Sequence, residues 1–149
     1  MAIRARAPTR IDFAGGTTDL AAFAAAEGGA VVSAAIDRYA YCSLTRVNGD
    51  GVRITAQDLQ QFVEAHDIRD LEYDGNLDLL KAAIRSLDLP GGLAIEARCD
   101  APPGSGTGSS ASLGVALLGL LDRLRATASA DRRHYLSRFE VADLACSLE

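Results

Sequence analysis

Apolar and β-branched positions along the chain gather in short runs separated by turn residues, which is the pattern of β-strands in a mixed domain. Residues 48–51, Asn-Gly-Asp-Gly, predict a hairpin turn because Asn-Gly accepts positive φ at both central positions. Val52–Ala56 is then the returning strand, while the pattern over Asp58–Ala65 is ambiguous. The predicted strands are Ile3–Ala7, Arg10–Phe13, Ala30–Ile36, Arg38–Val47, Val52–Ala56 and Leu93–Cys99.

Other segments have helical spacing or helix-end signals. Apolar residues recur with helical spacing up to Leu87, and Asn76 precedes them as a candidate N-cap. Ser137 and Glu140 stand three residues apart, which predicts a capping box at the start of the last helix. The predicted helices are Leu20–Ala26, residues 77–87, Leu113–Leu124, Ala130–Leu136 and Arg138–Leu148.

The order of these elements, several strands followed by helices, predicts an α+β fold. We expect two layers, with helices on one face of a mainly antiparallel sheet. No repeat, low-complexity linker or charge block divides the 149 residues, so residues 1–149 are predicted to form one domain.

Composition restricts the kinds of protein this chain can be. Hydrophobic residues make up 48% and charged residues 23%, as in a soluble globular protein, and the net charge of −5 does not attract nucleic acid. The N-terminus lacks the apolar core of a secretory signal, and no apolar run is long enough to cross a bilayer, so we expect a cytoplasmic protein with no membrane partner. Cys42, Cys99 and Cys146 are widely separated and are predicted to be reduced, buried side chains.

The segment from Asp100 to Ser112, Asp-Ala-Pro-Pro-Gly-Ser-Gly-Thr-Gly-Ser-Ser-Ala-Ser, carries the clearest chemical signal. It follows a predicted strand and opens a predicted helix, whose N-terminal amides and dipole attract an anion. Glycines let the backbone close around phosphate groups, and serine hydroxyls add donors and a ligand for magnesium. Lys81 is the only lysine beside 14 arginines, so an anion here would meet backbone amides or guanidinium groups.

Two other interpretations of this loop stay open. One is a flexible turn with an N-capping serine, although three glycines at alternate positions are more than a turn requires. The other is a dinucleotide fingerprint, because residues 106–111 satisfy GxGxxA, but that fold needs a strand after the helix and the sequence after Leu124 does not read as one. A lysine-bearing P-loop and a GxSxG nucleophile elbow are excluded, since neither pattern occurs in the segment.

The segment Pro102–Ala111 resembles the second motif of the GHMP kinases (galactokinase, homoserine kinase, mevalonate kinase and phosphomevalonate kinase). That motif is close to P-x-G-x-G-L-G-S-S-[AS], and Thr107 replaces its usual leucine. The resemblance implies that this loop holds the phosphates of ATP and that Ser110 approaches a magnesium ion. The implied nucleotide-binding residues are Pro103, Gly104, Ser105, Gly106, Thr107, Gly108, Ser109 and Ser110.

A second match lies near the N-terminus, where Pro8–Asp19 is similar to the family's first motif, P-x-R-[IV]-x-[FL]-x-G…D. Glu27–Asp37 continues the likeness, which is strongest to the heptose-phosphate kinases and fucokinases that phosphorylate an anomeric hydroxyl. Both motifs occur in the right order, about 90 residues apart. The chain is therefore identified as a member of the GHMP kinases, N-terminal ATP-binding part, which implies that family's left-handed βαβ element.

The resemblance also implies roles for individual residues. Arg10 would be catalytic, beside the transferred phosphate or the catalytic carboxylate, with an ordinary surface arginine as the alternative. Asp19 would accept hydrogen bonds from sugar hydroxyls, or else cap the following helix, and Gly15 and Gly16 would let the substrate approach the backbone. Glu149 would complete the magnesium site with Ser110, or else face solvent.

The implied activity is transfer of the ATP γ-phosphate, with Mg²⁺, to a hydroxyl of a sugar or sugar phosphate. We expect a heptose 7-phosphate, phosphorylated at the anomeric position, with a fucokinase- or galactokinase-like substrate as the alternative. In this family the catalytic aspartate follows the position of Glu149, so we expect the sequence to be incomplete, without the C-terminal domain, and inactive alone. A silent nucleotide-binding fragment and a dinucleotide-dependent oxidoreductase are the alternatives from other classes, and a homodimer stays open.

Overall fold

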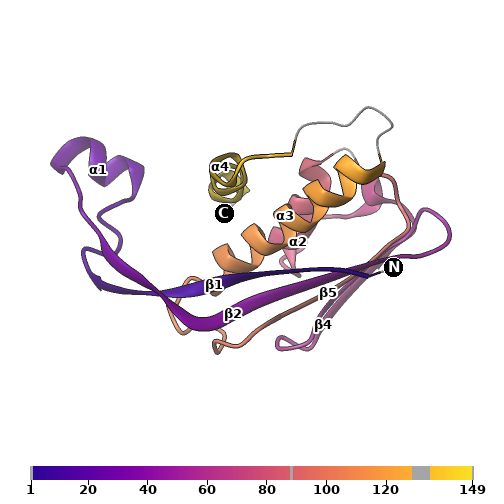
Figure 1. Cartoon of the computed structure of the whole chain (residues 1–149), viewed down its shortest axis with the longest axis horizontal. Helices are drawn as coiled ribbons and strands as arrows, with labels where there is room; N and C mark the ends of the chain where they lie inside the picture. Colours follow the sequence, from indigo (N-terminus) through magenta and orange to yellow (C-terminus); the bar gives the residue numbers. More distant parts are fainter. Residues whose placement is uncertain (1, 88, 129–134, 149) are drawn as a thin grey trace.

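The computed structural model describes residues 2–87, 89–128 and 135–148, and the described part has two layers, a five-stranded sheet and a set of helices (Figure 1). Helices α2, α3 and α4 lie over one face of the sheet, whereas α1 stands apart at the far end of β1 and β2. The elements are β1 (Ala2–Ala14), α1 (Ala21–Glu27), β2 (Val32–Arg46), β3 (Val52–Ala56), β4 (Gln61–Ala65), η1 (Ile68–Asp70), α2 (Asp78–Ser86), β5 (Leu93–Cys99), α3 (Ser109–Ala128) and α4 (Arg138–Leu148).

The sheet has the strand order β1-β2-β5-β3-β4. The pairs β1–β2, β2–β5 and β3–β4 are antiparallel, and only β3–β5 is parallel. This arrangement confirms the predicted α+β class with a mainly antiparallel sheet. The connection from β3 to β5 contains β4 and α2, and its left hand stays a prediction.

Two of the predicted strand breaks are wrong. The break at Pro8 is absent because β1 is an edge strand, where a proline's missing N–H removes no bond from the sheet interior. The break at Asp37 is instead a register shift. Pro8 pairs with Tyr39 and Arg10 pairs with Ala35, so two steps along β1 correspond to four steps along β2. The extra residues of β2 form a bulge, and the strand continues beyond it.

The predicted hairpin between β2 and β3 is also wrong, because β5 lies between these two strands. The chain still turns after β2, but the turn spans the start of β5. The amide of Val47 donates to the carbonyl of Gly92 at 2.9 Å, and the amide of Leu93 donates to the carbonyl of Gly51 at 3.0 Å. The ambiguous segment before Ala65 forms β4, which pairs with β3 as a hairpin.

The largest differences from the predicted helices concern α2, α3 and the segment before α4. Leu77 is the N-cap residue of α2, with φ of 57°, while Asn76 instead donates through its side chain to the carbonyl of Phe62 at 3.4 Å. Helix α3 begins at Ser109, four residues earlier than predicted, and runs to Ala128. The predicted helix Ala130–Leu136 falls mainly on residues 129–134, which lie outside the described residues, and its last two residues are not helical.

The capping box of α4 is confirmed. The amide of Ser137 donates to the Glu140 carboxylate at 2.8 Å, and the amide of Glu140 donates to the Ser137 hydroxyl at 3.3 Å. This reciprocal pair satisfies two of the amides that a helix start leaves without partners. It fixes the start of α4, whose residues Val141 and Ala145 are buried.

The core lies between the sheet and the helices. Leu44, Ile54 and Ile95 cover the inner face of the sheet, and Leu117 and Leu121 of α3 pack on it. All of these side chains are at most 1% exposed, so they account for much of the apolar area removed from water. None of the helices in the described ranges is both long enough and apolar enough to span a membrane.

The cysteines behave differently from one another. Cys42 is buried as predicted, with Sγ 3.9 Å from the carbonyl oxygen of Leu113. Burial raises the pKa of the Cys42 thiol to about 12, so it stays protonated and acts as a core side chain. Cys99 is half-buried and Cys146 is exposed, so the prediction that all three are buried is wrong. All three are free thiols.

Candidate functional site

The glycine-rich loop follows β5 directly and leads into α3. The amide of Ser112 donates to the carbonyl of Gly108 at 3.0 Å, which makes Gly108 the residue that opens the helix. The amides of the next residues therefore point along the helix axis at the positive end of its dipole. Gly104, Gly106 and Gly108 have φ of 73°, 70° and 66°, in the left-handed region.

The first and second sequence motifs meet at this loop. The amide of Arg10 in β1 donates to the carbonyl of Thr107 at 3.0 Å. The hydroxyl of Ser112 in α3 donates to the carbonyl of Pro8 at 2.9 Å. Segments about 100 residues apart in sequence are therefore joined by two hydrogen bonds, and the structure brings Arg10 to the loop as one site.

The side chain of Arg10 lies against the residue that opens α3. A Cβ placed on Gly108 would lie 2.5 Å from Nη1 of Arg10, so a side chain there would displace the guanidinium group from this position. Asp12 holds this group from the other side, with Oδ1 3.0 Å from Nε of Arg10. Gly16 borders the same carboxylate, since a Cβ on Gly16 would lie 3.5 Å from Oδ2 of Asp12.

Asp12 is a site residue that the sequence analysis did not single out. It lies two residues after Arg10 in an extended strand, and side chains at that spacing share one face of the strand. This spacing is the signal that could have identified it. The exposed fractions of the Arg10 and Asp12 side chains are 46% and 23%, so their ion pair is partly screened by water.

Replacing Asp12 with asparagine is expected to weaken binding of a non-hydrolysable ATP analogue by about two- to fivefold, the scale of one partly exposed ion pair. Asparagine keeps the size of the side chain but no longer holds the guanidinium group by charge. Isothermal titration calorimetry measures the change. Glu64→Gln is the matched control, because Glu64 pairs with Arg53 at 2.9 Å on the sheet, outside the loop. Equal affinities for wild type and Asp12→Asn would contradict this role.

The turn after β1 is closed by its own backbone. Thr18 donates to the carbonyl of Gly15 through its amide at 3.0 Å and through its hydroxyl at 2.7 Å. Gly15 has φ of 74°, and a Cβ there would lie 1.8 Å from the carbonyl oxygen of Ala30. The structure therefore gives Gly15 a packing reason to be glycine, and its predicted contact with a substrate stays a prediction.

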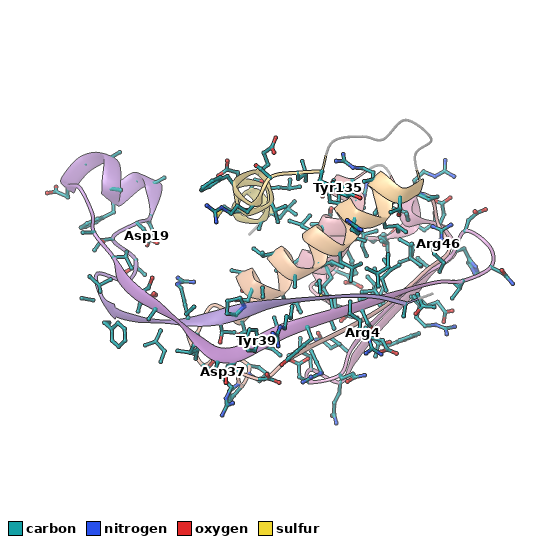
Figure 2. All side chains as sticks on the ribbon, in the orientation of Figure 1. Arg4, Asp19, Asp37, Tyr39, Arg46 and Tyr135 are labelled. Carbon is teal, nitrogen blue, oxygen red and sulfur yellow. The ribbon has the colours of Figure 1, made fainter. Side chains whose placement is uncertain are left out.

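Asp19 lies just before α1, apart from the layer formed by α2, α3 and α4 (Figure 2). The alternative that Asp19 caps this helix is wrong, because α1 has Leu20 as its N-cap residue and no side-chain cap bond. Asp19 is exposed and has no ion pair with another described residue. The structure does not join Asp19 to the glycine-rich loop by any contact among described residues, so its role toward a sugar stays a prediction.

A cavity of about 560 Å³ adjoins the loop at Ser110. Four segments line it: the turn before α2, α2 itself, the first turn of α3 and the last turn of α4. Sequence patterns did not predict this cavity, because its lining combines positions that are distant along the chain. The lining residues are Tyr73, Asp78, Leu79, Ala82, Ser110 and Leu148.

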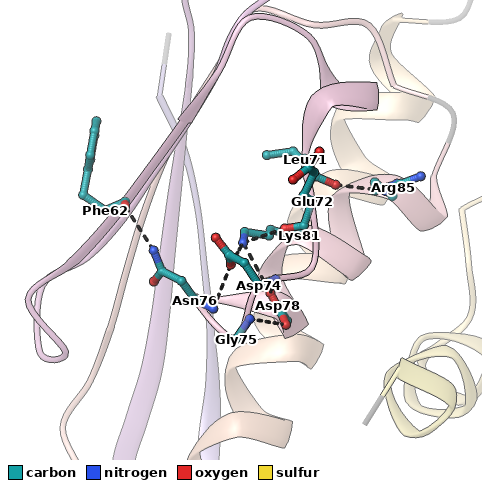
Figure 3. Close-up of polar contacts among 9 residues, drawn as sticks. All are labelled: Phe62, Leu71, Glu72, Asp74, Gly75, Asn76, Asp78, Lys81 and Arg85. Atoms are coloured by element: carbon teal, nitrogen blue, oxygen red, sulfur yellow. Dashed lines mark hydrogen bonds and ion pairs between the residues drawn. The ribbon is translucent and has the colours of Figure 1, made fainter.

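The single lysine holds the turn before α2 and the first residue of α2, Asp78 (Figure 3). The Lys81 side chain is only 2% exposed, and Nζ donates to the carbonyl of Glu72 at 2.8 Å, to Asp78 at 3.3 Å and to Asp74. Burial alone would lower the pKa of Lys81, but the hydrogen bonds to Asp74 and Asp78 outweigh burial and raise it. Among the described residues, the ammonium group of Lys81 thus donates its hydrogen bonds to Glu72, Asp74 and Asp78 and none to the glycine-rich loop.

The two carboxylates of this cluster stay charged. The hydrogen bond from Lys81 is the main cause that lowers the pKa of Asp74. Desolvation opposes ionisation of Asp78, but the Gly75 amide, at 2.8 Å, and Lys81 outweigh it and lower the pKa of Asp78 as well. The cluster therefore fixes one wall of the cavity by charge-assisted hydrogen bonds.

Of the two predicted magnesium ligands, the structure describes Ser110 but not Glu149. Ser110 lies in the first turn of α3, at the edge of the cavity. Glu149 lies outside the described residues. The predicted ligand roles of both residues toward magnesium stay predictions.

The fold and the loop define a class of protein, two-layer α+β domains with a glycine- and serine-rich loop at a helix start. Residues 77–149 match the family described as GHMP kinases N terminal domain. A D-glycero-D-manno-heptose 1-phosphate kinase from Bacteroides thetaiotaomicron has the same fold over 100% of the chain, with a TM-score of 0.82 and 30% identity. The chain belongs to the GHMP kinases, and residues 77–149 match the N-terminal domain of that family.

Two further proteins are similar to this chain, one in sequence and one in fold. D-glycero-alpha-D-manno-heptose 7-phosphate kinase of Campylobacter jejuni is 28% identical over 121 residues, which is 78% of this chain. Galactokinase of Lactococcus lactis, solved with galactose, shares the fold over 99% of the chain with a TM-score of 0.76 and 20% identity. The chain spans 36% of the length of the Campylobacter protein, 48% of the Bacteroides protein and 37% of the galactokinase.

Proposed function

We propose that this chain is the ATP-binding domain of a sugar kinase, which transfers the γ-phosphate of ATP to a hydroxyl of a sugar or sugar phosphate. The observation that carries the proposal is the join between Arg10 and the loop at the start of α3. It places a guanidinium group beside a helix N-terminus, and both attract a phosphate anion. Phosphoryl transfer depends mainly on positioning and charge stabilisation, which such a site supplies.

In this proposal, the base of the nucleotide lies in the cavity beside Ser110, and its phosphates lie at the loop that ends at Ser110. The cavity of about 560 Å³ has the size of a small-molecule site, and Tyr73, Leu79 and Leu148 offer apolar and aromatic surface to a base. The loop Pro103–Ser110 then meets the phosphates with its amides and hydroxyls. A magnesium ion bound with the nucleotide would neutralise phosphate charge, and we propose Ser110 and Glu149 as its protein ligands.

The substrate proposed for the whole protein is a heptose 7-phosphate, phosphorylated at the anomeric position. Its support is the likeness to two proteins named as heptose-phosphate kinases, together with the N-terminal motif at Pro8–Asp19. Asp19, Gly15 and Gly16 would contact the sugar, and Arg10 would face the transferred phosphate. A galactose- or fucose-like substrate is the alternative within the family.

The dinucleotide interpretation of the loop has no support in the fold. A dinucleotide-binding domain needs a parallel strand after the helix that follows the fingerprint. In the described part of the chain, the element after α3 is the helix α4, and the strands on either side of β2 are antiparallel to it.

Nucleotide titration of the ¹⁵N-labelled chain tests the proposed function. With Mg²⁺ and a non-hydrolysable ATP analogue, we expect one-to-one binding that shifts the amide signals of Gly104, Gly106 and Ser110. Signals of β4, at the opposite edge of the sheet, serve as an internal control. Binding of a nicotinamide dinucleotide in place of the ATP analogue, or no shift in the loop, would contradict the proposal. A sugar panel assayed with the full gene product then identifies the acceptor.

A further inference from the structure

The face of the sheet that points away from the helices is a second distinctive surface, here called the open face. Ala40, Cys42 and Leu44 of β2 are buried toward the helices, so the alternate residues of this strand point to the opposite side. No helix in the described ranges covers that side (Figure 1). The part of the open face considered next is formed by three neighbouring strands, β1, β2 and β5. Arg4 and Tyr39 lie along it in Figure 2.

The strand register assembles arginine side chains on this face. Arg6 of β1 and Arg98 of β5 both stand opposite Tyr41 of β2. In the next row, Arg4 and Glu96 stand opposite Ser43. The register therefore places two arginines of β1 and one of β5 on the two sides of β2, although Arg98 is far from the other two in sequence.

Aromatic rings hold two of these guanidinium groups in place. Cζ of Arg6 lies 4.5 Å from the centroid of the Tyr39 ring, and Cζ of Arg98 lies 4.0 Å from the centroid of the Tyr41 ring. Cation–π stacking leaves the N–H edges of a guanidinium group free to donate hydrogen bonds. The arginines are thus oriented by rigid strands and not by flexible loops.

Two carboxylates near this cluster, Glu96 and Asp100, balance only part of the charge of its three arginines. Elsewhere on the sheet Arg53 pairs with Glu64 at 2.9 Å, which is the usual arrangement for a solvated face. Arg98 has Asp100 at 2.8 Å, but neither Arg4 nor Arg6 has a carboxylate partner among the residues that the structure describes. A chain with net charge −5 therefore carries a local excess of positive charge here, which an anion would relieve.

The cluster also borders a hollow. A cavity of about 660 Å³ lies over the three strands, and its lining includes all three arginines together with Tyr41, Gln57 and Glu96. That volume is in the range of sites that hold metabolites. Tyr41 supplies an aromatic surface, while Gln57 and Glu96 supply hydrogen-bonding groups for a polar ligand.

We propose that the open face is a second binding site, for a small molecule that carries a phosphate group, held between Arg4, Arg6 and Arg98. Guanidinium groups bind phosphate oxygens in pairs of parallel hydrogen bonds, which favours phosphate over a monovalent ion such as chloride. The site lies on the opposite side of the sheet from α3, so it is separate from the nucleotide loop. It does not depend on the proposed kinase activity.

Inorganic phosphate is the probe for this site. In the ¹⁵N-labelled chain, the Nε–Hε signals of Arg4, Arg6 and Arg98 are expected to shift in a saturable way as phosphate is added. Arg53 is an internal control of the same residue type on the same sheet, and chloride at equal ionic strength controls for screening. The amides of Gly104 and Gly106 report separately on the nucleotide loop, so failure at one site is distinguishable from failure at the other.

A paired variant makes the test sharper. Arg4→Gln with Arg6→Gln is expected to weaken phosphate binding at the open face by about tenfold or more, since each charged donor contributes a strong hydrogen bond. Arg53→Gln is expected to leave it unchanged. The proposal is overturned if Arg53 shifts as much as the three cluster arginines, if phosphate moves only the loop amides, or if the folded paired variant binds as wild type does.

Discussion

Replacing Gly108 with valine is expected to reduce affinity for the ATP analogue by about a hundredfold or more. Gly108 has φ of 66°, which a β-branched residue adopts only with strain. Its new side chain would also occupy the place of Nη1 of Arg10, 2.5 Å from the Cβ position. The guanidinium group would move, and the first amides of α3 would lose their geometry toward a phosphate. Isothermal titration calorimetry measures the loss.

Gly119→Ala is the control for this variant, because Gly119 lies on the same helix and a Cβ there meets nothing within 4 Å. Its affinity for the analogue is expected to stay at the wild-type level, while the melting temperature stays constant or rises, since alanine favours a helix by about 1 kcal/mol over glycine. Circular dichroism checks that the Gly108 variant keeps its helices. A folded Gly108→Val protein with wild-type affinity would show that the loop does not bind the nucleotide.

Replacing Lys81 with methionine is expected to lower the free energy of unfolding by about 2–3 kcal/mol at pH 7. Methionine fills the buried space, but the Glu72 carbonyl and the carboxylates of Asp74 and Asp78 lose their shared donor. Urea unfolding followed by circular dichroism measures this loss. Arg69→Met is the control, because the Arg69 side chain is 88% exposed and its ion pair with Asp67 should contribute little.

The effect of Lys81→Met has a defined pH window. The pKa values of Asp74 and Asp78 are lowered in the folded state, so their contribution is present above the ordinary aspartate pKa near 3.9 and is lost as the pH falls through the folded values. The pKa of Lys81 is raised, so its contribution is present below about 10.4 and is lost above that range. A difference between variant and wild type that persisted unchanged at pH 2 would contradict the ion-pair explanation.

Local sequence signals predicted local structure well. The capping box of Ser137 and Glu140 forms as expected, because both partners lie within one helical turn. The two motifs at Pro8–Asp19 and Pro102–Ala111 predicted the family, and the structure joins them through Arg10 and Thr107. The capping box joins neighbours in sequence, and each of the two motifs is recognised from neighbouring residues, although the bond between them was not predicted.

Features that depend on distant pairing were not predictable in the same way. Residues 48–51 have the sequence of a hairpin turn, but β5, which begins at Leu93, lies between the two strands that this turn connects. Nothing in those four residues indicates that a later strand will be inserted there. Asn76 is a residue type that often caps a helix, but its side-chain amide instead donates a hydrogen bond to the carbonyl of Phe62 in β4. The cavity beside Ser110 combines four segments, so no single pattern in the sequence marks it.

The position of β5 has a consequence for how the domain is assembled. The strands made first form two separate pairs, β1 with β2 and β3 with β4, and no bond of the sheet joins the pairs directly. Among the strands of the described residues, β5 alone pairs with both, antiparallel to β2 and parallel to β3. On the ribosome, the two halves must therefore wait for residues 93–99 to emerge before a continuous sheet exists. The same short strand leads straight into the glycine-rich loop, so the sheet cannot be completed before the residues next to this loop have been made.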